Sequence, residues 1–269
     1  MKLAIAIPAR YASTRFPGKP LAMIAGKSML QRVTEIATKA AEGLDNVFIF
    51  VATDDKRIAD HANSLGVTCF NTPASCSTGS DRVLSAMRQL PEWPDFIINL
   101  QGDAPFTPPA VIQRIFEEFK KNPKSEVITP VHQLSWMDLD RLRDAKTQTP
   151  FSGTTAAIDK NGRALWFSKN LLPAIRKEDA LRQTQLRSPV YQHIGLYGFR
   201  SDILEQFCKL DQGIYEELEG LEQLRMLENN IRIQTVTLDI EDGMIQSGVD
   251  SPEDVGRAEA HIKKFGELV

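Results

Sequence analysis

Short apolar runs alternate with helical patterns through the first hundred residues of the chain. The apolar runs are predicted strands and lie at 3–7, 47–52, 67–70 and 96–100. Between them, apolar residues recur every three or four positions in predicted helices at 29–41, 57–65 and 78–90. Continuous apolar strands separated by helices are typical of a mostly parallel sheet with helices on both faces. The predicted fold class is therefore α/β.

The second half of the chain has a less regular pattern. It contains a predicted hairpin with an Asn-Gly turn, then a strand, a helix, a strand and a terminal helix, at 156–167, 193–199, 218–227, 231–238 and 252–265. No repeat and no Gly/Ser-rich linker divides the sequence. We therefore predict a single domain over residues 1–269, with an inserted β-rich lobe around 150–200.

Composition and charge exclude several classes of protein. The chain has 269 residues, of which 42% are hydrophobic and 25% charged, and its net charge is −3. A nucleic-acid-binding protein is usually more basic, and no apolar run is long enough to predict a membrane span. The N-terminus leads directly into a strand, without a signal-peptide pattern. Three cysteines without a CxxC motif argue against a disulfide framework or a zinc site. A cytoplasmic protein without a nucleic-acid or membrane partner is expected.

The stretch that follows the first predicted strand carries most of the candidate chemistry. Residues 8–20, here called the basic loop, read PARYASTRFPGKP and contain Arg10, Arg15 and Lys19 as well as Ser13. Cations, hydroxyls and free backbone N–H groups hold phosphate oxygens, so the loop is a candidate polyphosphate site. It matches neither the Walker A motif nor Gly-x-Gly-x-x-Gly. The alternative is a solvated basic loop without a ligand.

Two acidic positions are candidate metal ligands. Asp103 follows the predicted strand 96–100, and ligands of open α/β sheets bind at the carboxyl ends of strands. One or two carboxylates suit Mg²⁺, which takes its remaining ligands from water and phosphate. Asp103 is alternatively a turn or helix-cap residue. Asp250 precedes the terminal helix, so it either caps that helix or binds the metal, and the two roles are compatible.

Five stretches in chain order, PARYASTRFPGKPL, INLQGDAP, YQHIGLYGFR, LEGLEQLRML and SGVDSPEDV, extend over nearly the whole sequence. Together they resemble the 3-deoxy-D-manno-octulosonate (Kdo) cytidylyltransferases, or CMP-Kdo synthetases. The resemblance implies a mononucleotide-binding, Rossmann-like fold and a homodimer. It also implies the conversion of CTP and Kdo, an acidic eight-carbon sugar, to CMP-Kdo and pyrophosphate. Mg²⁺ is the implied cofactor and lipopolysaccharide biosynthesis the implied pathway.

The resemblance also assigns roles to residues of this sequence. Catalysis is implied for Lys19, Arg15 and Asp103, with Lys19 stabilising the charge that develops on the phosphates. Asp103 and Asp250 match metal ligands. The implied CTP-binding residues are Arg10, Ser13, Arg15, Lys19, Ser80, Arg82, Gln101 and Gly102. The implied sugar-binding residues are Lys169, His193, Tyr197, Glu222 and Gln223.

Several of these residues also have a purely structural interpretation. Ser80 lies where a helix is expected to begin, and such positions favour serine without any ligand. His193 lies in an apolar stretch, where a histidine is more often a core residue than a ligand contact. Glu222 and Gln223 are equally compatible with the solvated face of a helix.

The sequence departs from the family pattern at a few positions. Ala104 replaces an acid in QGDAP, Lys169 replaces an arginine after Phe-Ser, and 151–157 lacks the typical Val-Lys-Val. We assign these changes to the sugar half, which raises the hypothesis that the substrate is a modified Kdo, with 8-amino-8-deoxy-Kdo the first candidate. Two alternatives are a CMP-sialic-acid-type synthetase and a non-catalytic CTP-binding regulator.

Overall fold

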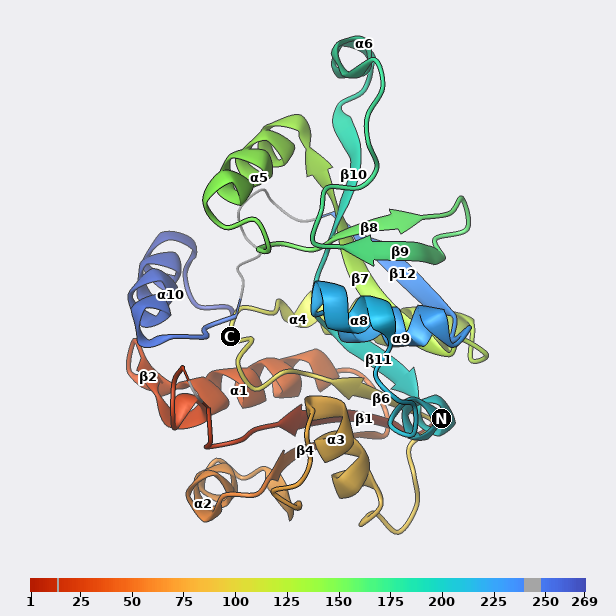
Figure 1. Ribbon diagram of the computed structural model, residues 1–269. Helices are drawn as coiled ribbons and strands as arrows, with labels where there is room; N and C mark the ends of the chain where they lie inside the picture. The colour runs from red at the N-terminus through yellow and green to blue at the C-terminus, as the bar shows by residue number, and fades with distance from the viewer. Residues whose placement is uncertain (14, 240–247) are drawn as a thin grey trace. The chain divides into compact units, whose positions relative to one another are not determined.

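The computed structural model describes residues 1–13, 15–239 and 248–269 (Figure 1). Its contacts divide the chain into two compact units. The first unit comprises 1–116, 198–208 and 246–269, and the second comprises 117–197 and 209–245. The predicted lobe around 150–200 falls almost entirely in the second unit, and the number of domains stays a prediction.

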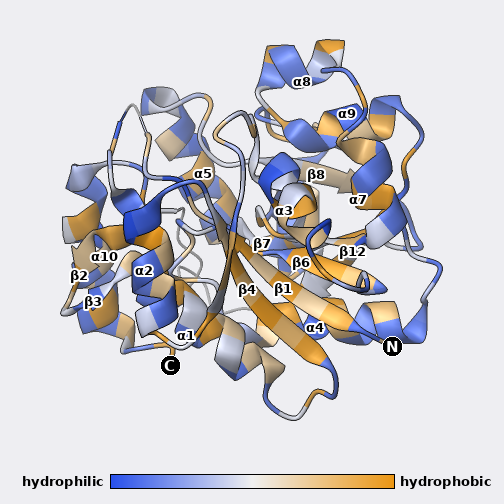
Figure 2. Cartoon of the chain, turned by 90° about the horizontal axis from the view of Figure 1, so that it is seen from below, coloured by the Kyte–Doolittle hydropathy of each residue, from blue (hydrophilic) through white to orange (hydrophobic). Residues whose placement is uncertain are grey.

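A mostly parallel sheet forms the centre of the first unit. Its strands are ordered β5 (Thr68–Asn71), β4 (Val47–Thr53), β1 (Leu3–Pro8), β6 (Phe96–Asn99) and β11 (Tyr197–Arg200), the last of which begins one residue before this unit. Strand β1 runs parallel to both β4 and β6, and β4 runs parallel to β5. All residues of β1 and β6 are buried, and Figure 2 shows β1 and β4 as largely hydrophobic. The predicted strands and their parallel arrangement are confirmed.

Helices cover this sheet because each parallel connection needs a crossover. The helices of the first unit are α1 (Met29–Ala41), α2 (Lys56–Ser64), α3 (Gly79–Met87), the start of α4 (Pro109–Lys121), α7 (Ser201–Phe207) and α10 (Pro252–Phe265). A 3₁₀ turn, Lys19–Leu21, and the small hairpin of β2 (Met23–Ile24) and β3 (Lys27–Ser28) precede α1. The β1–α1–β4 and β5–α3–β6 crossovers run in opposite directions across the sheet. Since such crossovers are right-handed, α1 and α3 cover opposite faces.

The second unit is built on a mostly antiparallel sheet. Strands β7 (Val127–Ser135), β10 (Arg187–His193), β8 (Thr155–Ile158) and β9 (Ala164–Ser168) follow one another, and β12 (Ile233–Leu238) pairs with β7 in parallel. Its helices are α5 (Trp136–Gln148), α6 (Glu178–Thr184), α8 (Ile214–Glu219) and α9 (Glu222–Glu228). The β8–β9 hairpin has Gly162 at φ 76° in the predicted Asn-Gly turn. The predicted β-rich character of the lobe is confirmed.

Two predicted elements of the second half are wrong. The stretch 193–199 is not one strand, because β10 ends at His193 and a tight turn, in which Leu196 N–H donates to Ile194 O at 2.7 Å, precedes β11. The stretch 218–227 is not one helix, because Gly220 adopts a left-handed conformation at φ 62° and separates α8 from α9. Glycine tolerates this conformation, so it ends a helix that the leucine periodicity alone would continue.

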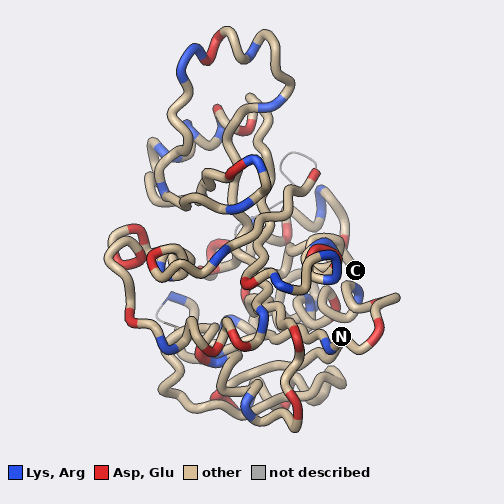
Figure 3. Tube along the Cα trace, turned by 90° about the vertical axis from the view of Figure 1, so that its right-hand side faces the viewer, with Lys and Arg blue, Asp and Glu red and all other residues tan. Residues whose placement is uncertain are grey.

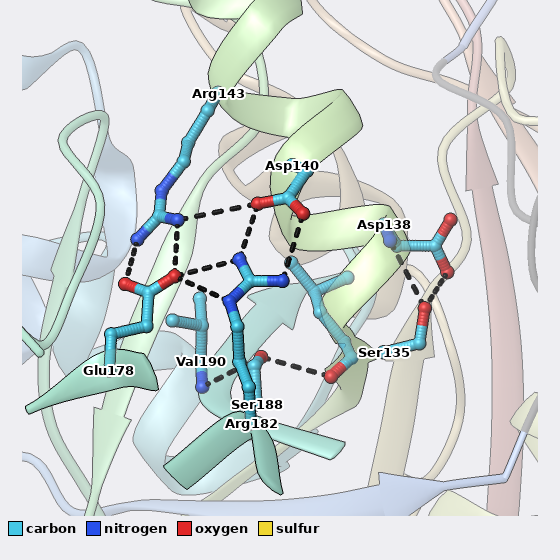
Figure 4. A network of polar contacts seen from close by, with 9 residues as sticks. Ser135, Asp138, Asp140, Arg143, Glu178, Arg182, Ser188 and Val190 are labelled. Carbon is cyan, nitrogen blue, oxygen red and sulfur yellow. Dashed lines mark hydrogen bonds and ion pairs between the residues drawn. The ribbon is translucent and has the colours of Figure 1, made fainter. Parts of the chain in front are cut away.

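An ion-pair network fixes α6 against α5 within the second unit (Figure 4). Arg143 donates to both carboxylate oxygens of Glu178 at 2.7 Å, and Arg182 bonds both Asp140 and Glu178. Hydrogen bonds from Arg143 and Arg182 lower the pKa of Glu178 to about 2. Such forked pairs supply geometric order, which here orients a helix of only seven residues.

Elsewhere charges of both signs are interspersed along the trace, in line with the net charge of −3 (Figure 3). Of the helices that the structure describes, none combines the length and the apolar character that crossing a bilayer requires.

Candidate functional site

The basic loop begins where β1 ends and folds back on itself. Gly18 N–H donates to Tyr11 O at 2.9 Å, and Lys19 N–H donates to Phe16 O at 3.2 Å. Gly18 has φ 72°, and a Cβ added there would lie 3.0 Å from the Tyr11 ring. A larger residue would be strained in this turn, so Gly18 permits the closure that turns Lys19 back towards the strand ends. Thr14, within the same loop, lies outside the described residues.

A neighbouring helix braces the loop from outside. The Arg57 guanidinium lies 3.3 Å from the centre of the Tyr11 ring, which is cation–π contact. Asp55, which caps the start of α2, holds that guanidinium through bonds of 2.7 and 3.0 Å. The arrangement links α2 to the loop, and the sequence analysis did not find it because Tyr11 and Arg57 carry no recognisable spacing.

Lys19 lies between two carboxylates. Its Nζ donates to Asp103 Oδ2 at 2.6 Å and to Asp250 Oδ1 at 3.1 Å, and Arg15 Nη2 lies 3.5 Å from the same Asp250 oxygen. The Lys19 side chain is 15% exposed, whereas Asp103 and Asp250 are 35% and 44% exposed. Three sequence segments separated by up to 231 positions thus bring their charges to one point.

Hydrogen bonds and close packing hold the backbone segments that carry the two carboxylates. Gly102 comes just after β6 in the chain and lies very close to the end of β1. A Cβ added there would lie 2.7 Å from Pro8 O. Val249 N–H donates to Asp103 O at 3.1 Å, which ties the segment before α10 to the turn after β6. The open question about Asp250 is answered in part, since Ser251 occupies the N-cap position of α10. The Asp254 carboxylate accepts from the Asp250 and Ser251 N–H groups, so the Asp250 carboxylate is available to Lys19.

A pocket of about 290 Å³ surrounds these charges, wholly within the first unit. Predicted site residues that line it are Arg10, Ser13, Arg15, Lys19, Arg82, Gln101, Gly102, Asp103 and Asp250. Cys76 and Ser77, which the sequence analysis did not single out, line it as well. The start of α3 also faces this pocket through Thr78 and Gly79, and a helix N-terminus favours anions. In the sequence, the start of this helix is indicated by the Thr-x-x-Asp capping pattern at 78–81.

Ser80 and Arg82 are placed differently from the exposed loop cations. Ser80 does not line the pocket; it is buried, and its Oγ accepts from Asn99 Nδ2 at 3.4 Å. Asn99 Oδ1 in turn accepts from Gln101 Nε2 at 3.2 Å, so Ser80 helps to position Gln101 through Asn99. The buried Arg82 guanidinium bonds Thr72 at 2.7 Å and Asp54 at 3.3 Å. Their predicted roles in CTP binding stay predictions.

The donor set at Lys19 fits a hard divalent cation. One ammonium reaches both Asp103 and Asp250, so the two carboxylates are close enough for one shared cation. Over residues 1–13, 15–239 and 248–269, no group of three or more His, Cys, Asp or Glu side chains could hold a metal. Two carboxylates completed by water and phosphate match Mg²⁺ and do not match a zinc centre.

The predicted sugar residues belong to the second unit, where His193 packs against aromatic rings. Its ring lies 4.9 Å from the Phe167 ring and 5.4 Å from the Tyr197 ring, centre to centre. Burial, and then the charge of Lys169, lowers the pKa of His193 to about 3, so the imidazole is neutral. Thr129 Oγ1 donates its single hydrogen to Leu196 O and lies 2.8 Å from His193 Nε2. His193 therefore carries its proton on Nε2 and keeps Nδ1 as an acceptor.

Charged residues of both signs flank this cluster. Burial lowers the pKa of Lys169 while Glu219 acts to raise it, and the Glu219 carboxylate accepts from Ser168 Oγ and Lys169 N–H at 2.8 and 2.6 Å. Burial, and then Glu222, raises the pKa of Tyr197. Gln223 is buried at the start of α9. Glu219 has no signal in the sequence, because its link to Lys169 spans 50 positions.

The structure corrects one grouping made from the sequence. Ala104 belongs to the first unit, directly after Asp103, and not with the sugar half. Thr155 accepts from Leu172 N–H at 3.0 Å and donates to Asn170 O at 2.6 Å, so it holds the chain after Lys169. Thr155 therefore has a structural role of its own. Its departure from the family pattern is weaker evidence about the identity of the sugar.

Comparisons with known proteins show the family of this chain. A family model described as cytidylyltransferase matches residues 4–233. The chain is 45% identical over 269 residues to the 3-deoxy-manno-octulosonate cytidylyltransferase of Maricaulis maris, covering 100% of both chains. This chain belongs to the 3-deoxy-manno-octulosonate cytidylyltransferase family. The family predicted from the sequence motifs is confirmed.

Two further relatives of the Kdo cytidylyltransferase family bear on the acceptor and the fold. The 8-amino-3,8-dideoxy-manno-octulosonate cytidylyltransferase of Shewanella amazonensis is 40% identical over 265 residues, covering 98% of this chain and 99% of its own. A solved structure of CMP:2-keto-3-deoxy-manno-octonic acid synthetase complexed with CTP superposes with a TM-score of 0.83 at 30% identity. That superposition covers 98% of this chain and 99% of the solved one. The fold class predicted from the apolar pattern is confirmed as well.

Proposed function

We propose that this protein transfers the cytidylyl group of CTP to a Kdo-type sugar, releasing pyrophosphate. The observation that carries the proposal is the basic loop closing on Lys19 beside Asp103 and Asp250 in one pocket. The hydroxyl of the sugar attacks the α-phosphorus of CTP and gives up its proton to water, and the bond from that phosphorus to the pyrophosphate oxygen breaks. Such a displacement needs positioning and charge neutralisation rather than a covalent intermediate.

Each part of the pocket has a task in this reaction. Arg10, Arg15 and the start of α3 bind the triphosphate, and Lys19 neutralises the charge that builds on the phosphates. Asp103 and Asp250 would hold Mg²⁺, which when bound supplies Lewis-acid polarisation of phosphate oxygens and lowers the pKa of a bound hydroxyl. The proximity of the two carboxylates, which share one ammonium, supports this cofactor.

The second unit supports recognition of an acidic sugar. Lys169 is half-buried, which strengthens its attraction for a sugar carboxylate relative to that of a solvated lysine. His193 offers a fixed neutral acceptor to a sugar hydroxyl, and Tyr197, Glu222 and Gln223 complete the predicted set. The 8-amino sugar, the first candidate among the modified Kdo forms, is favoured by the Shewanella relative and by Lys169 in place of the family's arginine.

Pyrophosphate release from CTP tests the function directly, with Kdo, 8-amino-8-deoxy-Kdo and a sialic acid compared at matched concentrations. Release with either eight-carbon sugar and not with sialic acid is expected. Equal or higher kcat/KM on ordinary Kdo rejects the amino-sugar hypothesis. CTP binding without release on any sugar favours the non-catalytic regulator, and release on sialic acid alone favours the nine-carbon branch.

The setting of the reaction completes the proposal. We infer a cytoplasmic enzyme of lipopolysaccharide biosynthesis that works as a homodimer through the second unit. Exposed apolar residues there support an interface, namely Leu165, Leu186, Ile214 and Leu218 at 57%, 98%, 72% and 72% exposure. Light scattering after gel filtration tests the dimer. A monomer at micromolar concentration would reject it.

A further inference from the structure

Lys19 is the main neutraliser of both carboxylates in the first-unit pocket. Its Nζ bonds Asp103 at 2.6 Å and Asp250 at 3.1 Å, whereas Arg15 reaches only Asp250, at 3.5 Å, with a side chain that is 70% exposed. An exposed, longer ion pair contributes little. The ammonium thus takes the position between two carboxylates that a divalent cation needs.

The surroundings leave the Lys19 side chain as the part able to move. The Asp103 backbone is tied to Val249, and the Asp250 backbone is tied to the Asp254 carboxylate. The Lys19 backbone is fixed by the turn that follows Phe16. A four-carbon side chain with rotatable donors can change partner while these backbones stay in place.

We infer that the Lys19 ammonium and the divalent cation are alternative occupants of the Asp103–Asp250 pair. On this account the protein alone binds the metal weakly, because binding has to displace Lys19. CTP relieves the competition, since its phosphates give Lys19 other oxygens to bond, and nucleotide and metal therefore bind cooperatively. The inference rests on the proposed function for the identity of the nucleotide, but the competition itself concerns side chains of this chain only.

Mn²⁺ suits carboxylate and water ligands as Mg²⁺ does, and its free and bound forms are distinguished by electron paramagnetic resonance. The test titrates Mn²⁺ into the whole protein without CTP, comparing wild type with Lys19→Gln. We expect Lys19→Gln to bind Mn²⁺ roughly tenfold or more tightly, as removal of a competing ion pair implies. Lys19→Arg retains a cation between the carboxylates and should keep the weak affinity of the wild type.

Arg10→Gln is the matched control for net charge. Arg10 lines the same pocket and is exposed, and the change removes the same charge without touching the carboxylate pair. We expect it to change Mn²⁺ affinity by about twofold or less. Equal tightening in Lys19→Gln and Arg10→Gln would reduce the effect to general electrostatics and overturn the inference. Unchanged affinity in a folded Lys19→Gln, checked by circular dichroism, would overturn it too.

CTP binding in the presence of Mg²⁺, measured by calorimetry, separates this inference from the proposed function. Failure of the wild type to bind CTP would contradict the proposed function and leave the Mn²⁺ comparison intact. Normal CTP binding with identical Mn²⁺ affinities in wild type and Lys19→Gln would contradict the inference alone.

Discussion

The two units differ in the charge of their candidate site residues and in how those residues are paired. In the first unit, Lys19 is paired with Asp103 and Asp250, all of them partly exposed. In the second unit, His193 is surrounded by the rings of Phe167 and Tyr197 and is neutral, with its pKa lowered to about 3 by burial and by Lys169. One site balances full charges beside water, and the other holds a neutral, part-buried imidazole in a fixed hydrogen-bond pattern.

The difference matches the proposed substrates. A triphosphate and a departing pyrophosphate carry charge that changes during the reaction, so their site needs cations that can exchange partners. Apart from the attacking hydroxyl, the hydroxyls of a sugar do not change charge, and a neutral, part-buried acceptor distinguishes them by position. Perturbing the first unit should therefore change turnover, whereas perturbing the second should change acceptor recognition and stability.

The largest effect is expected from the carboxylates. Asp103→Asn and Asp250→Asn should each lower kcat on the order of 10²-fold or more, because a metal ligand and a partner of Lys19 are lost together. Pyrophosphate release at saturating Mg²⁺ measures this. Asp60→Asn, which alters only an exposed pair with Lys56, is the control. Near-normal turnover in either variant would remove that residue from the metal site.

Lys19→Met is expected to lower kcat by roughly ten- to a hundredfold while raising the KM for CTP by less. The reason is that its charge is needed most when negative charge builds in the transition state. Arg10→Met should act more evenly on both constants. Steady-state kinetics at varied CTP distinguish the two. A raised KM with unchanged kcat would show that Lys19 serves binding only.

Stability should depend on pH through His193. Its folded pKa, about 3, lies below the unfolded value near 6.5, so only the unfolded chain takes up this proton between those values. Stability is then lost as pH falls below 6.5, by roughly 2 kcal/mol at pH 5. Urea unfolding of the wild type and His193→Gln at pH 7 and pH 5 checks this. The variant should lose less, and equal losses would place the proton uptake elsewhere.

Lys169→Ala should raise the KM for the sugar about tenfold and leave the KM for CTP unchanged, since one charge pairing with the sugar is lost. Lys160→Ala, an exposed residue in the β8–β9 turn of the same unit, is the matched control. A change of similar size in the KM for CTP would contradict the assignment of CTP binding to the first unit and sugar recognition to the second.

The smallest effect is expected from the brace on the basic loop. Arg57→Ala removes the cation–π contact with Tyr11 and should raise the KM for CTP a few-fold. Lys56→Ala, whose side chain bonds Asp60 instead, serves as the comparison. Identical KM values in the two variants would show that the loop keeps its conformation without the Arg57–Tyr11 contact.

The sequence predicted local features well wherever a short stretch carries its own signal. The apolar run at β1, the helix α1 and the terminal helix α10 are confirmed, the two helices with the bounds predicted. The motifs around Lys19, Asp103 and Asp250 identified the family. Both kinds of signal are local, because strand burial, helix periodicity and loop chemistry depend on residues close in the chain.

Tertiary structure decided what depends on partners far apart in the sequence. No pattern shows that Lys19 bonds residues 84 and 231 positions away, or that Thr129 fixes the tautomer of His193 from 64 positions away. Gly220 ends α8 within a periodic leucine run, where the pattern by itself continues the helix. The sequence by itself determined which groups this protein has for its chemistry. The packing of distant strands and loops decided which of them meet, because distance, burial and charge pairing arise only when the chain is folded.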